Sequence, residues 1–596
     1  MIEMGITLKA NLMKKLSQVA LGKEPADLIL KNADILNVYT GEVLHGFQVL
    51  IAGDRIAYVG PDHDFPVGPG TNVVDVEGKT VIPGMIDGHI HMDAWMSVGE
   101  FVRLSLPTGT TTIITECTSP SNSMGQQGVL EFINQLKDQP QRFFVTAPTI
   151  SFLCSNYGEN LKAIDADGML QLLRKPEVLG LGEIYWPNLL NGTSQEALIN
   201  LIEKTLEMGK VIGGHGAGAK NKKLAAMVAY GVNSCHEPIT AEEVQERLRF
   251  GLFTMIREGS VRQELSTVIA PLVKMKLDLR RAILVSDGTW PGVLMSQGHM
   301  NHIVQKAIDL GLDPVSAIRM VTLNAAEHFH LDDDLGGIAP GKCADLVIIP
   351  DLRTIVPQQV ICKGKLVAVA GKLLAEPAAL SYSLNTYECV RLPRIEPGYF
   401  KIKCEAIDNG EVKVRVIDLI TSIVNRETVL TLPVKNGVVS TSAIEDVIKA
   451  AVIDRYSGSG RGTIGLLKGY GLSRGALASS FSFDEGNLVV IGCNDDDMAF
   501  AVNRIKELNG GMVYCCDGKV IEEIPMPIFG SMSEMSGKEI ANSIKALEKS
   551  IRSAGCQGEN PLLTLFTITF TAIPSIRLLS RGYWLAKENR FAGIFA

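Results

Sequence analysis

The sequence lacks the features that mark secreted, membrane-spanning or nucleic-acid-binding chains. Its 11 cysteines are scattered, odd in number and without a CxxC pair, which is typical of reduced thiols in a cytosol rather than of a disulfide framework. No run of about 18 apolar residues occurs, so we expect no membrane span. The N-terminal stretch MIEMGITLKANLMKKLSQVALGKEPADLIL has no apolar core followed by a cleavage site, so we expect no signal peptide and a cytoplasmic location.

Clustered positive charge is also missing. The net charge is -8, and no basic cluster or arginine-rich arm is present. Nucleic acid and anionic membranes are therefore disfavoured as partners, and a small-molecule substrate is favoured over a polymer.

The remaining sequence has the patterning of a large α/β protein. A chain of 596 residues is too long for one core, so two or three domains are expected. Residues from about 26 to 81 alternate apolar and polar side chains, which predicts a small antiparallel sheet. From Val81 onward, short apolar runs alternate with helical stretches, which predicts parallel strands in either a closed (β/α)8 TIM-like barrel or an open doubly wound sheet. The eight candidate strands end near Asp87, Thr115, Thr146, Glu183, His215, His236, Ile256 and Asp287.

Strand patterns return after the last predicted helix. Asp313 and Pro314 indicate the start of that helix, as a cap and a first-turn residue. Strand-like segments follow over residues 335–352 and in VICKGKLVAVAGKLL, and we expect them to complete the small sheet around an inserted barrel. The predicted domains are a composite β-sandwich (1–80 and 335–377), a catalytic barrel (81–334) and a C-terminal α/β domain (378–596).

Polar side chains stand at the ends of several predicted strands. The stretch VIPGMIDGHIHMD places His89 and His91 on the same side of one strand, because side chains alternate with a period of two. In a barrel, all strand ends would form one ring around one mouth, so these positions favour the barrel over the open sheet. The other members of the ring are Glu183, His215, His236, Glu237 and Asp287.

Imidazoles and carboxylates in this combination indicate a transition-metal site. His89 and His91 can bind one ion, His215 and His236 a second, and Glu183 can offer one oxygen to each. A metal lowers the pKa of its water and so produces hydroxide at neutral pH, and Asp287 can accept the released proton. Any one of these residues alone is more often a hydrogen-bonded core side chain, and the alternative for the whole set is a polar network. Their shared location favours the metal site.

The same residues carry a family resemblance. VIPGMIDGHIHMD and GGIAPGKCADLVI resemble motifs of the metal-dependent amidohydrolase superfamily, and the adenine deaminase family is the more specific match. That match includes VLGLGE, GAGAKNKKLAAMVAYGVNSCHEPITAEEVQERLRFGLFTMIREGS, GHMNHIVQKAIDLGLDPVSAIRMVTLNAAEHF and CNDDDMAFAVNRIKELNGGMV. It covers nearly the whole chain, including the C-terminal segment.

The resemblance implies hydrolytic deamination of adenine to hypoxanthine and ammonia by a metal-bound hydroxide, in purine salvage. It implies that the metal is Mn²⁺, with Fe²⁺ or Zn²⁺ able to occupy similar sites, in a binuclear centre. The implied ligands are His89, His91, Glu183, His215, His236 and Asp287. We also expect a homo-oligomer, a dimer or larger.

Two carboxylates are the candidate catalytic groups. Asp287 would take the proton, and Glu237, which directly follows His236, would assist the ring nitrogen and the leaving amine. The alternative for Glu237 is a salt bridge to a barrel-mouth arginine such as Arg257. The candidate substrate-binding residues are Asp93, the planar Trp95 and Trp290, which can stack on a ring or simply fill space, and His299.

Four segments depart from the family pattern at polar positions: MDAWMS, TECTSPSN, SDGTWP and SFDEGN. In the last of these, Phe483 and Gly486 stand where histidines are expected. Two alternatives therefore stay open. One is an amidohydrolase acting on another aminated heterocycle or on a cyclic amide or imide, and the other is a non-catalytic paralogue.

Overall fold

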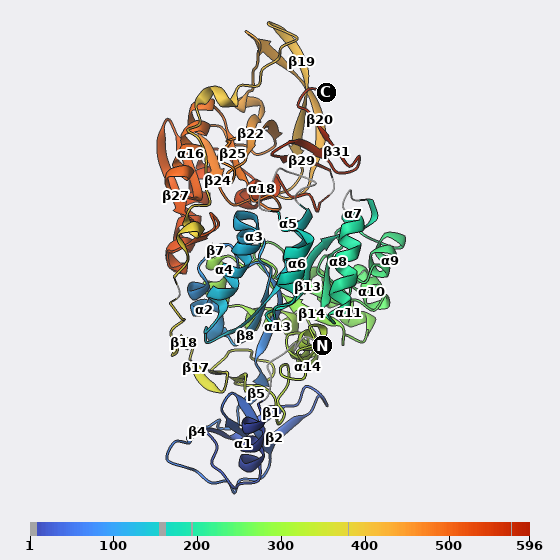
Figure 1. The fold of residues 1–596 in the computed structure, drawn as a ribbon, viewed down its shortest axis with the longest axis vertical. Coiled ribbons are helices and arrows are strands. Elements are labelled where there is room, and N and C mark those ends of the chain that lie inside the picture. The colour runs from blue at the N-terminus through green and yellow to red at the C-terminus, as the bar shows by residue number, and fades with distance from the viewer. Residues whose placement is uncertain (1–8, 154–162, 192–194, 380, 574) are drawn as a thin grey trace.

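The computed structural model describes residues 9–153, 163–191, 195–379, 381–573 and 575–596. Three regions are stacked along the long axis: a small sheet, a barrel and a β-rich C-terminal region (Figure 1). The ten cysteines within these ranges are free thiols, and Cys154 lies outside them. No helix among the described residues is long and apolar enough to cross a membrane.

The small sheet is built from both sides of the barrel sequence. Its nine strands pair in the order β18-β17-β16-β15-β5-β1-β2-β3, with β4 beside β1, and helix α1 (Ala10–Ala20) packs against β2 and β3. Strand β5 pairs antiparallel with β15, with Ile82 opposite Val347. This confirms that the returning segment completes the first sheet and that the barrel is an insertion. The strands are β1 (Leu28–Leu36), β2 (Val43–Ala52), β3 (Arg55–Gly60), β4 (Asn72–Asp75), β5 (Thr80–Pro83), β15 (Leu346–Ile349), β16 (Gln359–Cys362), β17 (Lys365–Val369) and β18 (Lys372–Leu373).

The eight predicted barrel strands all form, and each pairs in parallel with its neighbours. A parallel bridge between Ile90 and Asp287 joins the first strand to the segment after the last, which closes the barrel and excludes the open sheet. The first strand continues three residues past the predicted end at Asp87. The strands are β6 (Met85–Ile90), β8 (Thr110–Thr115), β9 (Arg142–Ala147), β10 (Val178–Tyr185), β11 (Val211–His215), β12 (Ser234–Cys235), β13 (Phe253–Arg257) and β14 (Ala282–Val285).

Helices surround the barrel strands and bury their outer faces. Strand β14 is buried along its whole length and entirely apolar, as expected for a strand covered on both sides. The predicted cap is present, because the Asp313 side chain accepts a hydrogen bond from the Ser316 amide at 2.9 Å. The helices are α2 (Val98–Ser105), η1 (Leu106–Thr108), α3 (Thr118–Met124), α4 (Gln126–Leu136), α5 (Thr149–Leu153), α6 (Ala166–Leu173), α7 (Trp186–Asn191), α8 (Gln195–Glu207), α9 (Lys222–Ala229), α10 (Ala241–Arg249), α11 (Leu265–Met275), α12 (Pro291–Gln297), α13 (Met300–Asp309), α14 (Pro314–Arg319) and α15 (Leu323–His328).

The C-terminal region is a mixed, mainly antiparallel sheet in the order β21-β20-β19-β23-β22-β25-β24-β26-β27. Helix α16 packs on β24, β25 and β26, and a separate three-stranded sheet follows. The strands are β19 (Gly410–Leu419), β20 (Asn425–Lys435), β21 (Val438–Val439), β22 (Val447–Ile453), β23 (Gly462–Lys468), β24 (Ala476–Ser479), β25 (Leu488–Gly492), β26 (Gly511–Cys516), β27 (Lys519–Pro525), β29 (Ile576–Leu579), β30 (Gly582–Leu585) and β31 (Arg590–Ala592). The helices are η3 (Leu384–Tyr387), η4 (Pro397–Phe400), η5 (Ala443–Glu445), α16 (Asp495–Glu507), α17 (Gly537–Ser553) and α18 (Pro561–Thr567).

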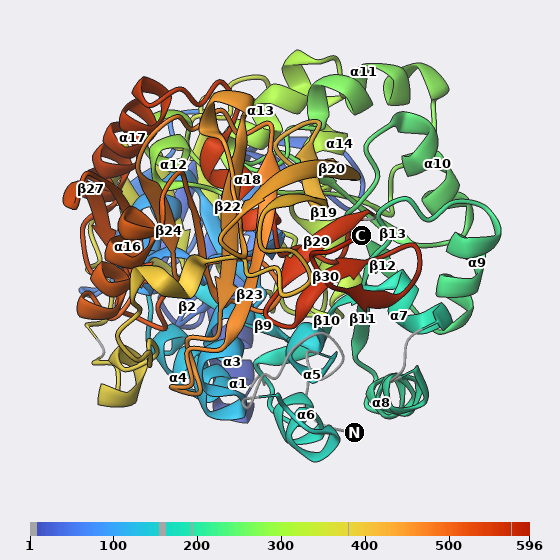
Figure 2. The same ribbon diagram turned by 90° about the horizontal axis from the view of Figure 1, so that it is seen from above.

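The C-terminal region is joined to the barrel at its mouth. Strand β7 (Trp95–Met96), just after the first barrel strand, pairs in parallel with β28 (Met532–Ser533). The Trp95 amide also donates to the Ser531 carbonyl at 2.9 Å. Seen along the stacking direction, the orange and red C-terminal segments overlie part of the barrel (Figure 2).

A buried ion pair joins the barrel to the small sheet. Arg142 on β9 donates through Nε to Asp345 Oδ2 at 2.7 Å, and the two side chains are 8% and 5% exposed. Asp345 also accepts from the Lys363 amide through Oδ1 at 2.7 Å. Its carboxylate therefore balances the charge of a buried guanidinium and accepts a hydrogen bond from an amide that is largely removed from water.

We expect Asp345→Ala to destabilise the protein by about 3 kcal/mol, because it leaves a buried arginine without its counter-charge. Differential scanning calorimetry would measure this as a lower midpoint for the first unfolding transition. Glu207→Gln is the matched control, because the Lys204–Glu207 pair is about half exposed and such pairs contribute little. Equal midpoints for Asp345→Ala and the control would contradict the prediction.

Candidate active site

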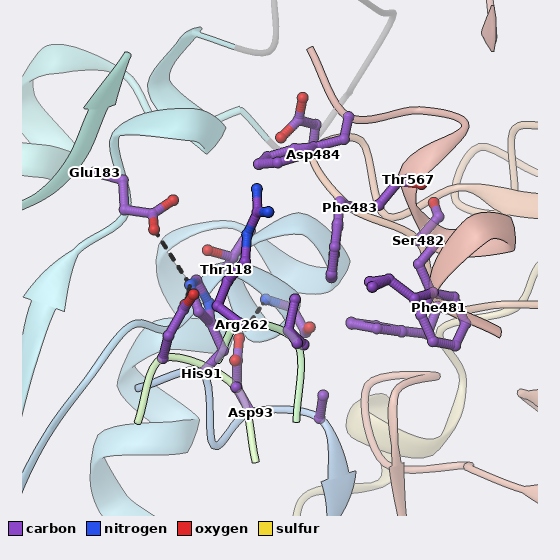
Figure 3. A pocket seen from close by; sticks show the side chains of 18 of the residues that line it. His91, Asp93, Thr118, Glu183, Arg262, Phe481, Ser482, Phe483, Asp484 and Thr567 are labelled. Atoms are coloured by element: carbon purple, nitrogen blue, oxygen red, sulfur yellow. Dashed lines mark hydrogen bonds and ion pairs between the residues drawn. The ribbon is translucent and has the colours of Figure 1, made fainter. Parts of the chain in front are cut away.

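Four predicted ligands form one group at the barrel mouth. His89 lies on β6, His91 just after it, Glu183 near the end of β10, and Asp287 after β14. Glu183 Oε1 is 3.3 Å from Nε2 of both His89 and His91, and Asp287 Oδ1 lies 3.6 and 3.8 Å from the same two nitrogens. Figure 3 shows His91 directed toward Glu183.

Backbone pairing fixes this group where the barrel closes. The Asp287 amide donates to the His89 carbonyl at 3.0 Å, and the His91 amide donates to the Asp287 carbonyl at 2.7 Å. Asp287 has a φ of 61°, a left-handed conformation that aspartate tolerates better than most residues. The closure of the barrel therefore brings together ligands from the first and last strands.

The second group contains His215, His236 and Glu237. His215 ends β11, and the other two residues follow β12. Glu237 Oε1 lies 3.2 Å from His215 Nε2 and 3.5 Å from His236 Nε2. His236 Nε2 is also 3.0 Å from Glu183 Oε1, so Glu183 links the two groups. The structure thus brings together all six predicted metal ligands.

The donor set fits divalent metal. Within each group, the ligand atoms lie within 4.8 Å of one another. His89 Nε2 is buried and lies close to Glu183 Oε1, yet it makes no aligned hydrogen bond with a described residue. Burial alone would lower the pKa of His91, but Glu183 raises it to about 9, so the cluster stabilises positive charge. A divalent ion can supply that charge to imidazole and carboxylate ligands.

Glu237 forms an ion pair with Arg257, the arrangement that the sequence left open as the alternative to a catalytic role. Its Oε1 accepts from Arg257 Nη1, and Arg257 also bonds Glu264 at 3.1 Å and Asp287 Oδ2 at 3.4 Å. Burial alone would raise the pKa of Glu237, but Arg257 and His215 lower it to about 2. Glu237 is therefore held as a carboxylate, which favours a role in holding charge over one in donating a proton.

Glu116, at the end of β8, was not among the predicted site residues. It is 4% exposed, and its Oε1 lies 3.7 Å from His89 Nδ1, on the side of the ring away from Glu183. A Cβ at Gly182 would overlap Glu116 Oε2, so the glycine of VLGLGE leaves room for this carboxylate. Burial and the charge of Glu183 raise the pKa of Glu116 to about 7, although His89 opposes this. The signal available in the sequence was the position of Glu116, an acidic residue directly after the apolar run of the second barrel strand.

All members of the two ligand groups except His89 line the floor of a cavity of about 110 Å³. Since a single water needs roughly 10–15 Å³ on such a scale, this space holds a small ligand or several waters. Asp93, Trp95 and Trp290 line it, as predicted for substrate-binding residues. The Trp95 and Trp290 ring centroids are 5.3 Å apart, and buried Asp93 accepts from the Ser119 amide at 2.6 Å.

The C-terminal region supplies the opposite wall, of which the sequence had indicated only the segment SFDEGN with Phe483. Its lining residues are Ile423, Phe481, Ser482, Phe483, Asp484, Leu563, Phe566, Thr567 and Phe570. Figure 3 shows Phe481 and Phe483 across the cavity from His91 and Glu183. Asp484 accepts a hydrogen bond from the Tyr185 hydroxyl at 2.8 Å, and the Tyr185 ring packs edge-on against His215. The wall is therefore bonded to the strand that carries Glu183.

The structure places His299 outside the cavity lining. Its side chain is fully buried, with Nε2 3.0 Å from Asp87 Oδ2 and Nδ1 3.0 Å from Thr110 Oγ1. Asp87 in turn accepts hydrogen bonds from the Ser286 amide and hydroxyl. His299 thus supports the segment before Asp287 and has no surface for a substrate, which corrects its predicted role.

Comparisons with known proteins match both large regions. The amidohydrolase family model matches residues 80–367, and the adenine deaminase C-terminal domain model matches residues 422–590. The chain is 36% identical to an adenine deaminase of Moorella thermoacetica over 578 residues, which cover 96% of each chain. The chain belongs to the adenine deaminase family.

Other adenine deaminase relatives are similar over the same extent. One from Clostridium botulinum (strain Loch Maree / Type A3) is 36% identical over 98% of this chain and 97% of its own length. One from Cenarchaeum symbiosum (strain A) is 35% identical over 98% of this chain and 95% of its own length. The family relationship thus includes the C-terminal region that forms the aromatic wall.

Glu183→Gln is expected to reduce metal binding in both ligand groups, because Glu183 Oε1 lies against His89, His91 and His236. His91→Asn should reduce binding in the first group alone. Elemental analysis after loading with Mn²⁺ and removal of free metal would measure both. His302→Asn is the control, since His302 lies on α13 outside the cavity lining. Wild-type metal content in Glu183→Gln would show that Glu183 does not join the two groups.

Proposed function

We propose that this protein hydrolyses adenine to hypoxanthine and ammonia, using divalent metal held by His89, His91, Glu183, His215, His236 and Asp287. One observation carries the proposal: Glu183 Oε1 lies within 3.3 Å of three imidazole nitrogens, at the floor of a cavity walled by aromatic rings. The similarity to proteins named adenine deaminase over nearly the full chain supports the choice of substrate. Mn²⁺ in a binuclear centre, a homo-oligomer, and purine salvage in the cytoplasm remain predictions.

A bound divalent ion would activate water for attack at neutral pH. Asp287 would take the proton released in this step. Its Oδ1 faces His89 and His91, while its Oδ2 faces Arg257. With Oδ1 committed to the ligand group, Oδ2 would take the first proton from the water and pass it to a ring nitrogen. It would then pass the second proton, from the added hydroxyl, to the departing amine. Water adds at the carbon that bears the amino group, and ammonia leaves from that carbon.

The neighbouring residues hold this geometry. Arg257 bonds both Glu237 and Asp287, so one guanidinium sets the spacing of two carboxylates. Trp95 and Trp290 offer flat surfaces on which a purine can stack. The C-terminal wall covers one side of the cavity, which would limit the access of bulk water and strengthen the electrostatic interactions within it.

Wild-type protein supplied with Mn²⁺ should release ammonia from adenine. Asp287→Asn should lower kcat by about 10²- to 10⁴-fold, because the amide cannot accept the proton. Coupled detection of ammonia and hypoxanthine would measure both rates, and Asp278→Asn, at an exposed position, is the control. Turnover of lactams or cyclic imides without release of ammonia from adenine would replace this proposal by the other amidohydrolase function.

A further inference from the structure

Arg262 presents a guanidinium to the cavity from the segment between β13 and α11. It lines the cavity, and its side chain is 23% exposed. Its ion-pair contact with Glu264 is long, with Nε 4.0 Å from Glu264 Oε1. Figure 3 shows Arg262 within the cavity, between the side of Glu183 and His91 and the side of Phe483.

The neighbouring Arg257 shows how a structural arginine is bonded at this mouth. Arg257 is fully buried and contacts Glu237, Glu264 and Asp287. Glu264 lies 3.1 Å from Arg257, closer than it lies to Arg262, so it mainly compensates Arg257. The donors of Arg262 therefore remain directed to the cavity, where a ligand can accept them.

Four other polar groups of the lining are already committed to partners within the protein. The Tyr185 hydroxyl donates to Asp484, Asn122 Nδ2 to the Asp484 carbonyl, the Ser482 hydroxyl to the Asn487 carbonyl, and the Thr567 hydroxyl to the Ser422 carbonyl. The remaining wall is largely aromatic, and the ring centroids of Phe481 and Phe483 are 5.8 Å apart. A guanidinium donor in such an environment contributes more to binding than it would in water.

We propose that Arg262 binds the substrate by donating hydrogen bonds to an acceptor nitrogen on the ring edge that faces away from the ligand groups. This rests on the proposed function, which places the amino-bearing carbon beside Asp287. The far part of a planar bicyclic ring then lies toward Arg262 and the phenylalanines. Arg262 selects amino-heterocycles that carry an acceptor on that edge, and the aromatic wall favours rings whose remaining perimeter is apolar.

The test combines variants of Arg262 with substrates that lack one acceptor each. Arg262→Gln should raise KM for adenine by about 10- to 100-fold, with kcat changed far less and metal content unchanged. Arg262→Lys should recover part of the loss, because it keeps the charge and loses the planar fork. Arg280→Gln is the matched control, since Arg280 is 77% exposed and outside the cavity lining.

With 3-deazaadenine and 7-deazaadenine, a CH group replaces one ring acceptor at a time. N3 lies opposite the amino-bearing carbon, so 3-deazaadenine should be a poorer substrate for the wild type but should suffer little further loss in Arg262→Gln. N7 lies beside that carbon, so 7-deazaadenine should show the same loss in Arg262→Gln as adenine. Unchanged KM in Arg262→Gln, or penalties for both analogues that persist in full in the variant, would overturn the role of Arg262.

The outcomes separate this inference from the proposed function. A wild type that releases no ammonia from adenine contradicts the proposed function. A wild type that does so, while Arg262→Gln matches it, contradicts only the role of Arg262. If Arg262→Gln loses metal or its folded circular dichroism signal, Arg262→Lys with the two analogues decides instead, since it retains a cation beside Glu264. A wild-type KM for adenine in Arg262→Lys, with wild-type discrimination between the analogues, would then overturn the inference.

Discussion

The candidate site depends on a single carboxylate oxygen, Glu183 Oε1, which faces the Nε2 atoms of His89, His91 and His236. His89 and His91 come from the end of the first barrel strand and His236 from the end of the sixth, so the barrel must form before they can meet around Glu183. Glu183 is largely buried, and a buried carboxylate is costly unless positive charge compensates it. Divalent ions bound by these side chains would meet that need, and the same ions would make the floor of the cavity chemically active.

The barrel alone does not form the cavity. Strand β7 follows directly from the segment that carries His89 and His91, and it pairs with β28 of the C-terminal region. The bond between Tyr185 and Asp484 makes a second connection, two residues beyond Glu183. The ligand groups and the aromatic wall are therefore held by contacts adjacent in sequence to the ligands themselves. A shift of the C-terminal region would change both the shape of the cavity and the support of the ligand strands.

The sequence predicted the parts of this site that local patterns determine. Strand periodicity and terminal polar residues located the eight barrel strands and the ring of histidines and carboxylates, because parallel strands end at the same edge. In the C-terminal region the family pattern singled out Phe483, but the sequence did not show that Phe481, Phe566 and Phe570 join it in a cavity wall, since phenylalanine is equally typical of a buried core. The burial of His299 was also not visible, because its partners Asp87 and Thr110 are distant in sequence. Arg262 was missed for a related reason. The sequence around a single loop arginine does not show whether its side chain points into a cavity or into solvent.

The pairing of β5 with β15 also affects how the chain is made. Strand β5 is synthesised before the barrel, but its partner β15 follows about 260 residues later. At about 5–20 residues per second, one edge of β5 stays exposed on the ribosome for roughly 10–50 s. An open, apolar strand edge invites pairing with other nascent chains. This fold therefore depends on the barrel being completed promptly, and conditions that slow translation would favour aggregation of the unfinished chain.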